Sequence, residues 1–134
     1  MEILSDSKYQ LIQYDTETRI IGNVWKLETE KSTADEFKAE IAKFGEFIAK
    51  KKPVGILGNT LNLRFPITPD VQNWIVSDFY SVIIKTGTRK FAVLVSTDLL
   101  TGLSVEQTVE ENKEEELMMK YFDDSEKAKL WIKQ

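Results

Sequence analysis

Residues 90–96, with the sequence KFAVLVS, indicate the fold class, because the strand that they predict has no polar face. Such a strand lies in the middle of a sheet that helices cover on both sides. We therefore expect an α/β domain. The apolar side chains alternate as Phe91, Val93 and Val95 on one face and Ala92 and Leu94 on the other.

Helices are predicted on either side of this strand along the chain. Thr33 and Glu36 have the spacing of a capping box, which starts a helix whose apolar residues recur every three or four positions. Thr68 followed by Pro69 is a second helix start, with Thr as N-cap and Pro at the first helical position. In chain order, the four predicted helices cover residues 34–52, 69–85, 105–117 and 125–133.

Five strands are predicted around these helices. Residues 9–15 and 19–25 flank a short turn and are expected to form an antiparallel hairpin. Residues 54–57, 90–96 and 119–122 alternate with helices, which indicates parallel strands joined by right-handed crossovers. The sequence thus predicts one domain over residues 1–134, with a mixed five-stranded sheet that has an antiparallel first strand and is covered by four helices.

The charge of the chain is concentrated at its C-terminal end. The net charge is −4 over 134 residues, and the whole excess of acidic side chains lies in residues 106–134. The one basic run, residues 50–52, closes a predicted helix, where cations complement the negative end of the helix dipole. Nucleic acids and anionic lipids both need clustered Lys and Arg, so we expect neither as a partner.

Composition restricts the chemistry further. The chain has no Cys and no His, which excludes disulfides, thiolate chemistry, His-based triads and the usual zinc sites. The longest apolar run, residues 91–95, is far too short to span a bilayer. The first residues lack the basic and apolar regions of a signal peptide. We therefore expect a cytoplasmic protein without a membrane span and without a cofactor.

No catalytic or metal-binding motif is present. The chain lacks the Gly-x-Ser-x-Gly, phosphate-loop and Gly-x-Gly-x-x-Gly patterns. The acidic run Glu114–Glu116 is expected to be solvated surface, since neighbouring helical residues point in different directions, and Asp124 is expected to cap a helix. We predict no catalytic residues, no metal ligands and no enzymatic activity.

The order of these elements resembles the STAS-like fold, named after sulfate transporters and anti-sigma-factor antagonists, and in particular small bacterial members of unassigned function. The resemblance covers roughly residues 9–133. It rests on packing and capping patterns in the segments Gly55–Thr60, Phe65–Ile75, Leu103–Thr108 and Tyr121–Asp124, together with Ala128 and Trp131. It therefore implies a fold more than a function.

Signalling members of that family carry a phosphoacceptor Ser in a turn between a strand and the next helix. This chain departs from the pattern, because Gly58-Asn59-Thr60-Leu61-Asn62 contains no Ser and no following Gly. Thr60 is the one hydroxyl in the corresponding place. The simpler interpretation of Thr60 is a turn residue that bonds nearby backbone.

The segment 58–68 is the predicted binding site. Ligands of open α/β sheets meet the loops after the carboxyl ends of parallel strands, and this loop is longer than the usual two to six residues. We expect Leu61, Leu63 and Phe65 to point inward and the polar side chains to face a partner. Alternatively, the loop pads the sheet edge and its Arg pairs with a surface carboxylate. The predicted binding residues are Asn59, Thr60, Asn62 and Arg64.

Two functions remain after these exclusions. The first is a regulatory module that binds another protein or a second copy of this chain, as STAS domains do in anti-sigma-factor circuits. The second is a carrier or sensor of a small apolar ligand, a use known for the related CRAL-TRIO fold. A carrier needs a cavity of roughly 300 Å³ or more. We ranked the interaction module first, because a 134-residue domain has little core to spare.

Overall fold

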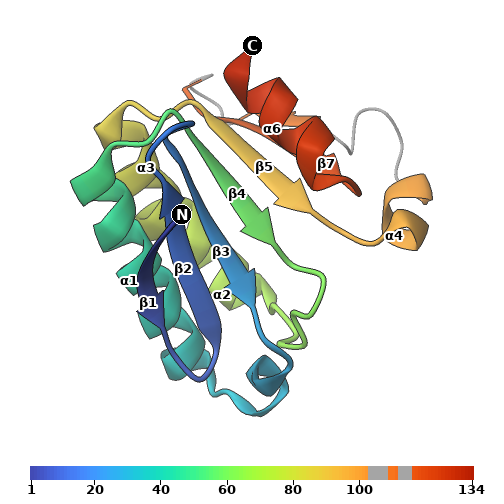
Figure 1. Cartoon of the computed structure of the whole chain (residues 1–134). Helices are drawn as coiled ribbons and strands as arrows, with labels where there is room; N and C mark the ends of the chain where they lie inside the picture. The colour runs from blue at the N-terminus through green and yellow to red at the C-terminus, as the bar shows by residue number, and fades with distance from the viewer. Residues whose placement is uncertain (103–108, 112–115) are drawn as a thin grey trace.

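The computed structural model describes residues 1–102, 109–111 and 116–134 of the chain. A mixed seven-stranded sheet forms its centre, in the order β1-β2-β3-β4-β5-β7-β6 (Figure 1). The predicted α/β class is confirmed, with antiparallel strands first and parallel strands after them. The strands are β1 (Glu2–Asp6), β2 (Gln10–Asp15), β3 (Ile20–Trp25), β4 (Gly55–Asn59), β5 (Lys90–Leu94), β6 (Val109–Glu111) and β7 (Met118–Phe122).

The predicted hairpin is confirmed, since β2 and β3 pair antiparallel along their whole length. The carboxylate of Asp15 closes the turn by accepting the backbone N–H groups of Glu17 (3.0 Å) and Thr18 (3.4 Å). The bond from Glu17 is the main reason why the pKa of Asp15 lies below its ordinary value. Strand β1 pairs with the outer side of β2 and was not predicted, because its side chains are mostly exposed and show no alternation.

Helix α1 (Ala34–Lys51) begins at the predicted capping box. The Thr33 hydroxyl accepts the N–H of Glu36 at 3.1 Å, and the Glu36 carboxylate accepts the N–H of Thr33 at 2.8 Å. The helix ends at Lys52, which adopts a left-handed conformation with φ of 47° before Pro53. Its buried stripe follows the predicted spacing and consists of Phe37, Ile41, Phe44 and Ile48, together with Gly45.

The second predicted helix is confirmed in extent but not in its internal geometry. It starts at the N-cap Thr68 and ends at Gly87, whose φ is 86°. Between these caps the backbone changes its hydrogen-bonding pattern twice. The pieces are α2 (Pro69–Trp74), a π-helical segment (Ile75–Phe79) and α3 (Tyr80–Thr86).

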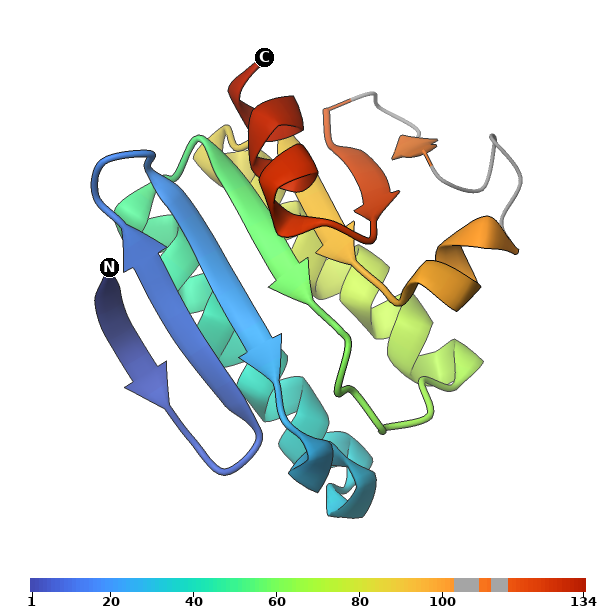
Figure 2. The same cartoon turned by 45° about the vertical axis from the view of Figure 1, so that its right-hand side comes forward.

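The topology places the helices in two layers. Strands β3, β4, β5 and β7 are parallel and follow one another in the same direction across the sheet. Right-handed crossovers in one direction put the connecting helices on one face, and α1 and α3 indeed lie side by side there (Figures 1 and 2). Helix α6 (Ser125–Lys133) covers β4, β5 and β7 on the opposite face.

The C-terminal third departs most from the prediction. A helix was predicted over residues 105–117, but residues 109–111 form β6, which pairs antiparallel with β7. The helix prediction is wrong there, and residues 103–108 and 112–115 lie outside the described part. A short helix, α4 (Thr97–Thr101), was not predicted. Strand β7 and the Asp124 cap of α6 are confirmed, with Asp124 accepting the N–H of Glu126 at 2.8 Å.

The two faces of the sheet carry separate cores. The larger core lies under α1 and α3, and the smaller core lies under α6. In the smaller core the backbone of Gly55 lies so close to the side chain of Ile132 that a Cβ at this position would collide with it. Among the described helices, none combines the length and the apolar character needed to cross a membrane.

Candidate functional site

A pocket of about 390 Å³ opens between the sheet and the helices on the α1/α3 face. Its floor is the middle of β3, β4 and β5, and its mouth is bordered by the partly exposed residues Leu63, Ile67, Gln72 and Tyr80. The volume lies in the range of small-molecule sites, about 300–1,000 Å³. The buried lining residues are Asn23, Trp25, Phe37, Ile41, Phe44, Gly58, Ile75, Phe79, Phe91, Val93 and Met119.

Aromatic rings make up much of the pocket wall. The ring of Phe37 on α1 lies between Trp25, at a centroid distance of 4.8 Å, and Phe65 of the loop after β4, at 4.4 Å. On the other side, Phe79 contacts both Phe44 (5.9 Å) and Phe91 (6.2 Å). The walls therefore offer flat, polarisable surfaces, which suit a ligand that contains a ring.

The π-helical segment sets the shape of one wall. The N–H of Tyr80 bonds the carbonyl of Ile75, five residues earlier, in place of the usual four. This wider turn brings Ile75, Phe79 and Tyr80 to the same side of the helix, and all three line the pocket. Such π turns inside α-helices are frequent at functional sites.

The space at the floor of the pocket depends on Gly58. This residue lies in β4, opposite Asn23 of β3, on the face that α1 and α3 cover. A Cβ at Gly58 would lie 3.0 Å from Phe91 Cε1 and 3.3 Å from Asn23 Oδ1. The absence of a side chain therefore leaves the space beside the Asn23 carboxamide unfilled at the pocket floor.

One polar side chain is buried at this floor. Asn23 is only 4% exposed, and its Nδ2 donates to Oε1 of the fully buried Gln10 at 3.0 Å. Gln10 Nε2 in turn donates to the backbone carbonyl of Glu40 (2.6 Å) and to its carboxylate (3.1 Å). A polar chain thus runs from α1 through β2 to the pocket floor.

The pocket holds no formal charge. Within the described part of the chain, none of its lining residues is Asp, Glu, Lys or Arg. Tyr9, Asp15 and Glu36, whose pKa values depart from the ordinary ones, lie outside the pocket lining. Burial, with the neighbouring Glu36 carboxylate, raises the pKa of Tyr9, while hydrogen bonds from the Thr33 backbone and the Tyr9 hydroxyl lower the pKa of Glu36. The site therefore suits a neutral ligand.

The predicted binding residues do not converge on one site. Asn59 and Thr60 follow each other along the chain and point to opposite faces of the sheet, as strand alternation requires. Thr60 lines the large pocket, and its hydroxyl donates to the carbonyl of Leu94 at 2.8 Å, which ties the end of β4 to β5. The Asn59 carboxamide oxygen accepts the N–H of Leu61 at 3.0 Å and so shapes the turn.

The other two predicted residues lie further out on the loop. Asn62 is exposed. The Arg64 guanidinium donates to the carbonyls of Leu61 and Leu63, both at 3.2 Å, and has no carboxylate partner among the described residues. Leu61 was predicted to point inward but is 45% exposed, because the chain turns at residues 61–62 and breaks the alternation. This loop borders the pocket without providing its polar contact.

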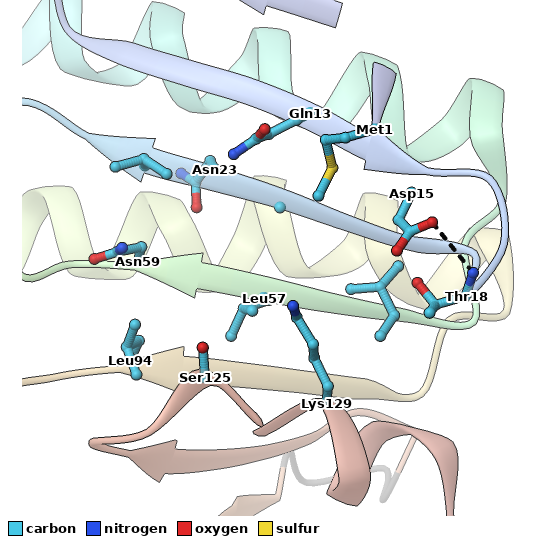
Figure 3. Close-up of a pocket in the computed structure, with 13 residues that line it drawn as sticks. Met1, Gln13, Asp15, Thr18, Asn23, Leu57, Asn59, Leu94, Ser125 and Lys129 are labelled. Atoms are coloured by element: carbon cyan, nitrogen blue, oxygen red, sulfur yellow. Dashed lines mark hydrogen bonds between the residues drawn. The ribbon is translucent and has the colours of Figure 1, made fainter. Parts of the chain in front are cut away.

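A second, smaller hollow of about 170 Å³ lies on the opposite face of the sheet (Figure 3). Asn59, Gln13 and Leu57 line it from the strands, and Ser125 and Lys129 line it from α6. Lys129 also pairs with Glu126 at 3.6 Å. This hollow is below the usual size of a ligand site. Two larger hollows, of about 1,040 Å³ beside Arg19 and Lys90 and about 630 Å³ beside Glu46 and Trp74, are more open to solvent, so we consider the more enclosed pocket between the sheet and α1 to be the candidate site.

Sequence reasoning missed Asn23, although a signal was present. In the predicted strand 19–25 the inward positions are Ile21, Asn23 and Trp25, so a carboxamide occupies a position between two large apolar residues. Buried polar groups need partners, and a polar residue on a core face indicates a buried network or a site. That reasoning would have drawn attention to β3 rather than to the loop after β4.

Comparison with known proteins gives no family for this chain: no family model, no curated protein and no solved structure matches it. The resemblance to STAS-like domains therefore stays a prediction, and the function has to be inferred from the pocket itself.

Proposed function

We propose that this protein binds a small, neutral, largely apolar molecule in the pocket between β3–β5 and the helices α1 and α3, and acts as its carrier or sensor. The observation that carries the proposal is the pocket volume of about 390 Å³ in a 134-residue domain. A cavity of about 150 Å³ is enough for benzene. The pocket therefore has room for a ligand of two or three fused rings.

Packing energetics support a ligand. The pocket opens to solvent at its mouth, so the side chains of its walls lack packing partners on the pocket side. Water fills such a space poorly, because the mostly apolar walls offer it few hydrogen-bonding partners. An apolar ligand would restore the missing contacts.

The pocket also changes the ranking of the two functions. The interaction module was ranked first on the ground that so small a domain lacks room for a cavity, and the described core contains one. The lining residues favour binding over catalysis, because the described ones include no carboxylate and no Lys to move a proton. We therefore place the carrier or sensor ahead of the interaction module.

The proposal is tested with a matched pair of variants. Gly58→Ala adds a methyl group on the pocket floor, and Gly22→Ala adds one on the adjacent strand at the opposite face, where it would lie 3.1 Å from the Leu57 carbonyl oxygen. A Cβ is close to a neighbouring atom at both positions, to a ring carbon of Phe91 at Gly58 and to a backbone oxygen at Gly22. We expect 2-methylnaphthalene to bind wild-type protein and Gly22→Ala alike, and Gly58→Ala at least about tenfold more weakly, a loss of about 1.4 kcal/mol.

Binding is measured by isothermal titration calorimetry, and unfolding is followed in parallel to confirm that both variants are folded. Native mass spectrometry of freshly purified protein shows whether a small molecule is retained from the cell. If wild-type protein binds no hydrophobic ring compound, or if Gly58→Ala binds as well as wild type, the pocket is not the site and the proposal is wrong.

An interaction module remains a second candidate, on the evidence of one sheet edge. In the part of the chain that is described, β1 pairs with β2 alone, and Ile3 on β1 is 65% exposed. An open edge strand presents backbone N–H and C=O groups that a strand of another molecule can pair with. We propose a second copy of this chain as the partner. Sedimentation equilibrium should then show a dimer that Ile3→Lys disrupts.

A further inference from the structure

The buried carboxamide of Asn23 leaves one hydrogen-bonding group without a partner. Its Oδ1 is buried and finds no donor among the residues that the structure describes. A buried acceptor that stays unpaired costs about 1–3 kcal/mol, so such groups are rare in folded proteins and call for an explanation.

The orientation of this carboxamide follows from the chain of hydrogen bonds behind it. The carbonyl oxygen of Glu40 can only accept, so the group of Gln10 that lies 2.6 Å from it must be the amino group. Gln10 Oε1 therefore faces Asn23 and needs a donor, and among the described residues Asn23 Nδ2 supplies it at 3.0 Å. The side-chain oxygen of Asn23 is consequently the atom without a hydrogen-bonding partner among the described residues. Flipping either amide would place two donors or two acceptors together.

The unpaired oxygen, Asn23 Oδ1, lies at the floor of the pocket. It lies 3.3 Å from the place of the missing Cβ of Gly58, at the floor that both residues line. Asn23 itself cannot turn away, because its amino group is held by Gln10 and Gln10 is held by α1. The described lining of the pocket is thus mostly apolar and aromatic, and a fixed hydrogen-bond acceptor lies at its floor.

We infer that the ligand is a neutral ring compound with a hydrogen-bond donor at its buried end, a phenol-type hydroxyl or a ring N–H, and that Asn23 Oδ1 accepts this hydrogen bond. The inference rests on the proposed function, since it names the ligand class for the same pocket. A cation is disfavoured because the described lining has no carboxylate to pair with it, and an anion or a bare acceptor would face the Asn23 oxygen unfavourably.

The test compares two probes of nearly the same shape, 2-naphthol and 2-methylnaphthalene, in wild-type protein and in Asn23→Leu. The hydroxyl of 2-naphthol is better hydrated than a methyl group, so the affinity ratio in one protein is not informative by itself. The change of that ratio between the two proteins isolates the bond to Asn23. We expect the ratio to shift against 2-naphthol by about 5- to 100-fold, corresponding to about 1–3 kcal/mol.

Asn23→Leu removes the partner of Gln10 Oε1, so this variant can lose stability. The double variant Gln10→Met with Asn23→Leu leaves no unpaired amide at either position, and its cost is limited to the two bonds from Gln10 to Glu40. It should show the same shift in the ratio. Circular dichroism and unfolding curves show which of the two variants is folded, and the affinity ratio is measured in a folded variant.

The outcomes separate the two proposals. If both probes bind wild-type protein and their affinity ratio is the same in the Asn23 variants, the ligand class is wrong while the pocket stands. If neither probe binds wild-type protein, the proposed function fails and the ligand class fails with it. A ratio that shifts toward 2-naphthol in the variants would also overturn the inference.

Discussion

The helices pack on the two faces of the sheet with different closeness. On one face, the 18-residue helix α1 and the long helical segment 69–86 cover the strands, and a pocket of about 390 Å³ remains. On the other face, the nine-residue helix α6 is the cover, and it approaches so closely that Gly55 has no room for a Cβ. The face that the longer helices cover is therefore the one with the larger pocket.

The pocket does not come from a lack of apolar side chains. Its floor and walls carry Trp25, Phe37 and Phe79, among the largest side chains of the core. The space comes instead from a missing side chain at Gly58, a wide turn in the helix and a polar residue at the floor. Interiors normally pack without voids larger than water, so a hollow built from such specific features indicates a site.

The largest expected difference between the faces is in truncations of buried Ile residues. Ile132→Ala removes side-chain atoms from the tight contact with Gly55, and we expect a loss of about 4 kcal/mol in the free energy of unfolding, near the upper end of such changes. Ile75→Ala lies beside the pocket, loses fewer contacts and should cost about 2 kcal/mol. Urea unfolding at neutral pH measures both.

Leu130→Ala on α6 is the control, because this side chain is 65% exposed and a surface truncation costs within about 0.5 kcal/mol. Equal losses for Ile132→Ala and Ile75→Ala would contradict the contrast between a tight and a hollow face.

Enlarging two neighbouring residues of β5 should have effects of opposite sign. Ala92 is fully buried under α6, so Ala92→Val overpacks that face and should cost about 1–3 kcal/mol. Val93 lines the pocket, so Val93→Ile adds a methyl group into free space and should gain up to about 1 kcal/mol. Thermal unfolding of both variants gives the comparison. A loss for Val93→Ile as large as that for Ala92→Val would mean that the pocket has no room.

The smallest expected effect concerns the start of α1 and its dependence on pH. The Thr33 backbone N–H, followed by the Tyr9 hydroxyl, lowers the pKa of the Glu36 carboxyl from its ordinary value of 4.5. A lowered pKa means that the ionised carboxylate stabilises the fold above pH 4.5, and that this contribution is lost as the pH falls further, through the folded pKa.

Stability measured from pH 6 down to pH 3 should therefore fall more steeply in wild-type protein than in Glu36→Gln, which keeps the capping box without the charge. Tyr9→Phe should lie between them, since it removes one of the two donors. Identical slopes in all three proteins would show that this cap does not depend on ionisation.

Local signals were enough to predict most elements of the first 95 residues, with β1 and the π-helical segment as exceptions. The hairpin, the capping box at Thr33 and the Thr68-Pro69 helix start each depend on a few neighbouring residues, and all are confirmed. The failure at residues 109–111 has a physical reason. Ser104 and Gln107 imitate a capping box, but β6 is set by its pairing with β7, a contact that no local pattern encodes.

The candidate site was predicted only at its border. The general rule for open α/β sheets led to the loop after β4, and Thr60 of that loop does line the pocket. The acceptor at the floor was missed because Asn23, considered alone, is one polar residue in a strand. Its role depends on Gln10 and Glu40, which lie 13 and 17 positions away along the chain and meet it only in the fold.

The π-helical segment can also be considered in terms of chain length. A turn that closes on the fifth residue instead of the fourth holds one residue more than a straight α-helix would need between the same two ends. Deleting one residue within Ile75–Phe79 would therefore let the segment 69–86 close into a regular helix without moving its caps. Tyr80 would then rotate away from Ile75 and from the pocket. The extra residue of this turn therefore keeps the ring of Tyr80 at the pocket mouth.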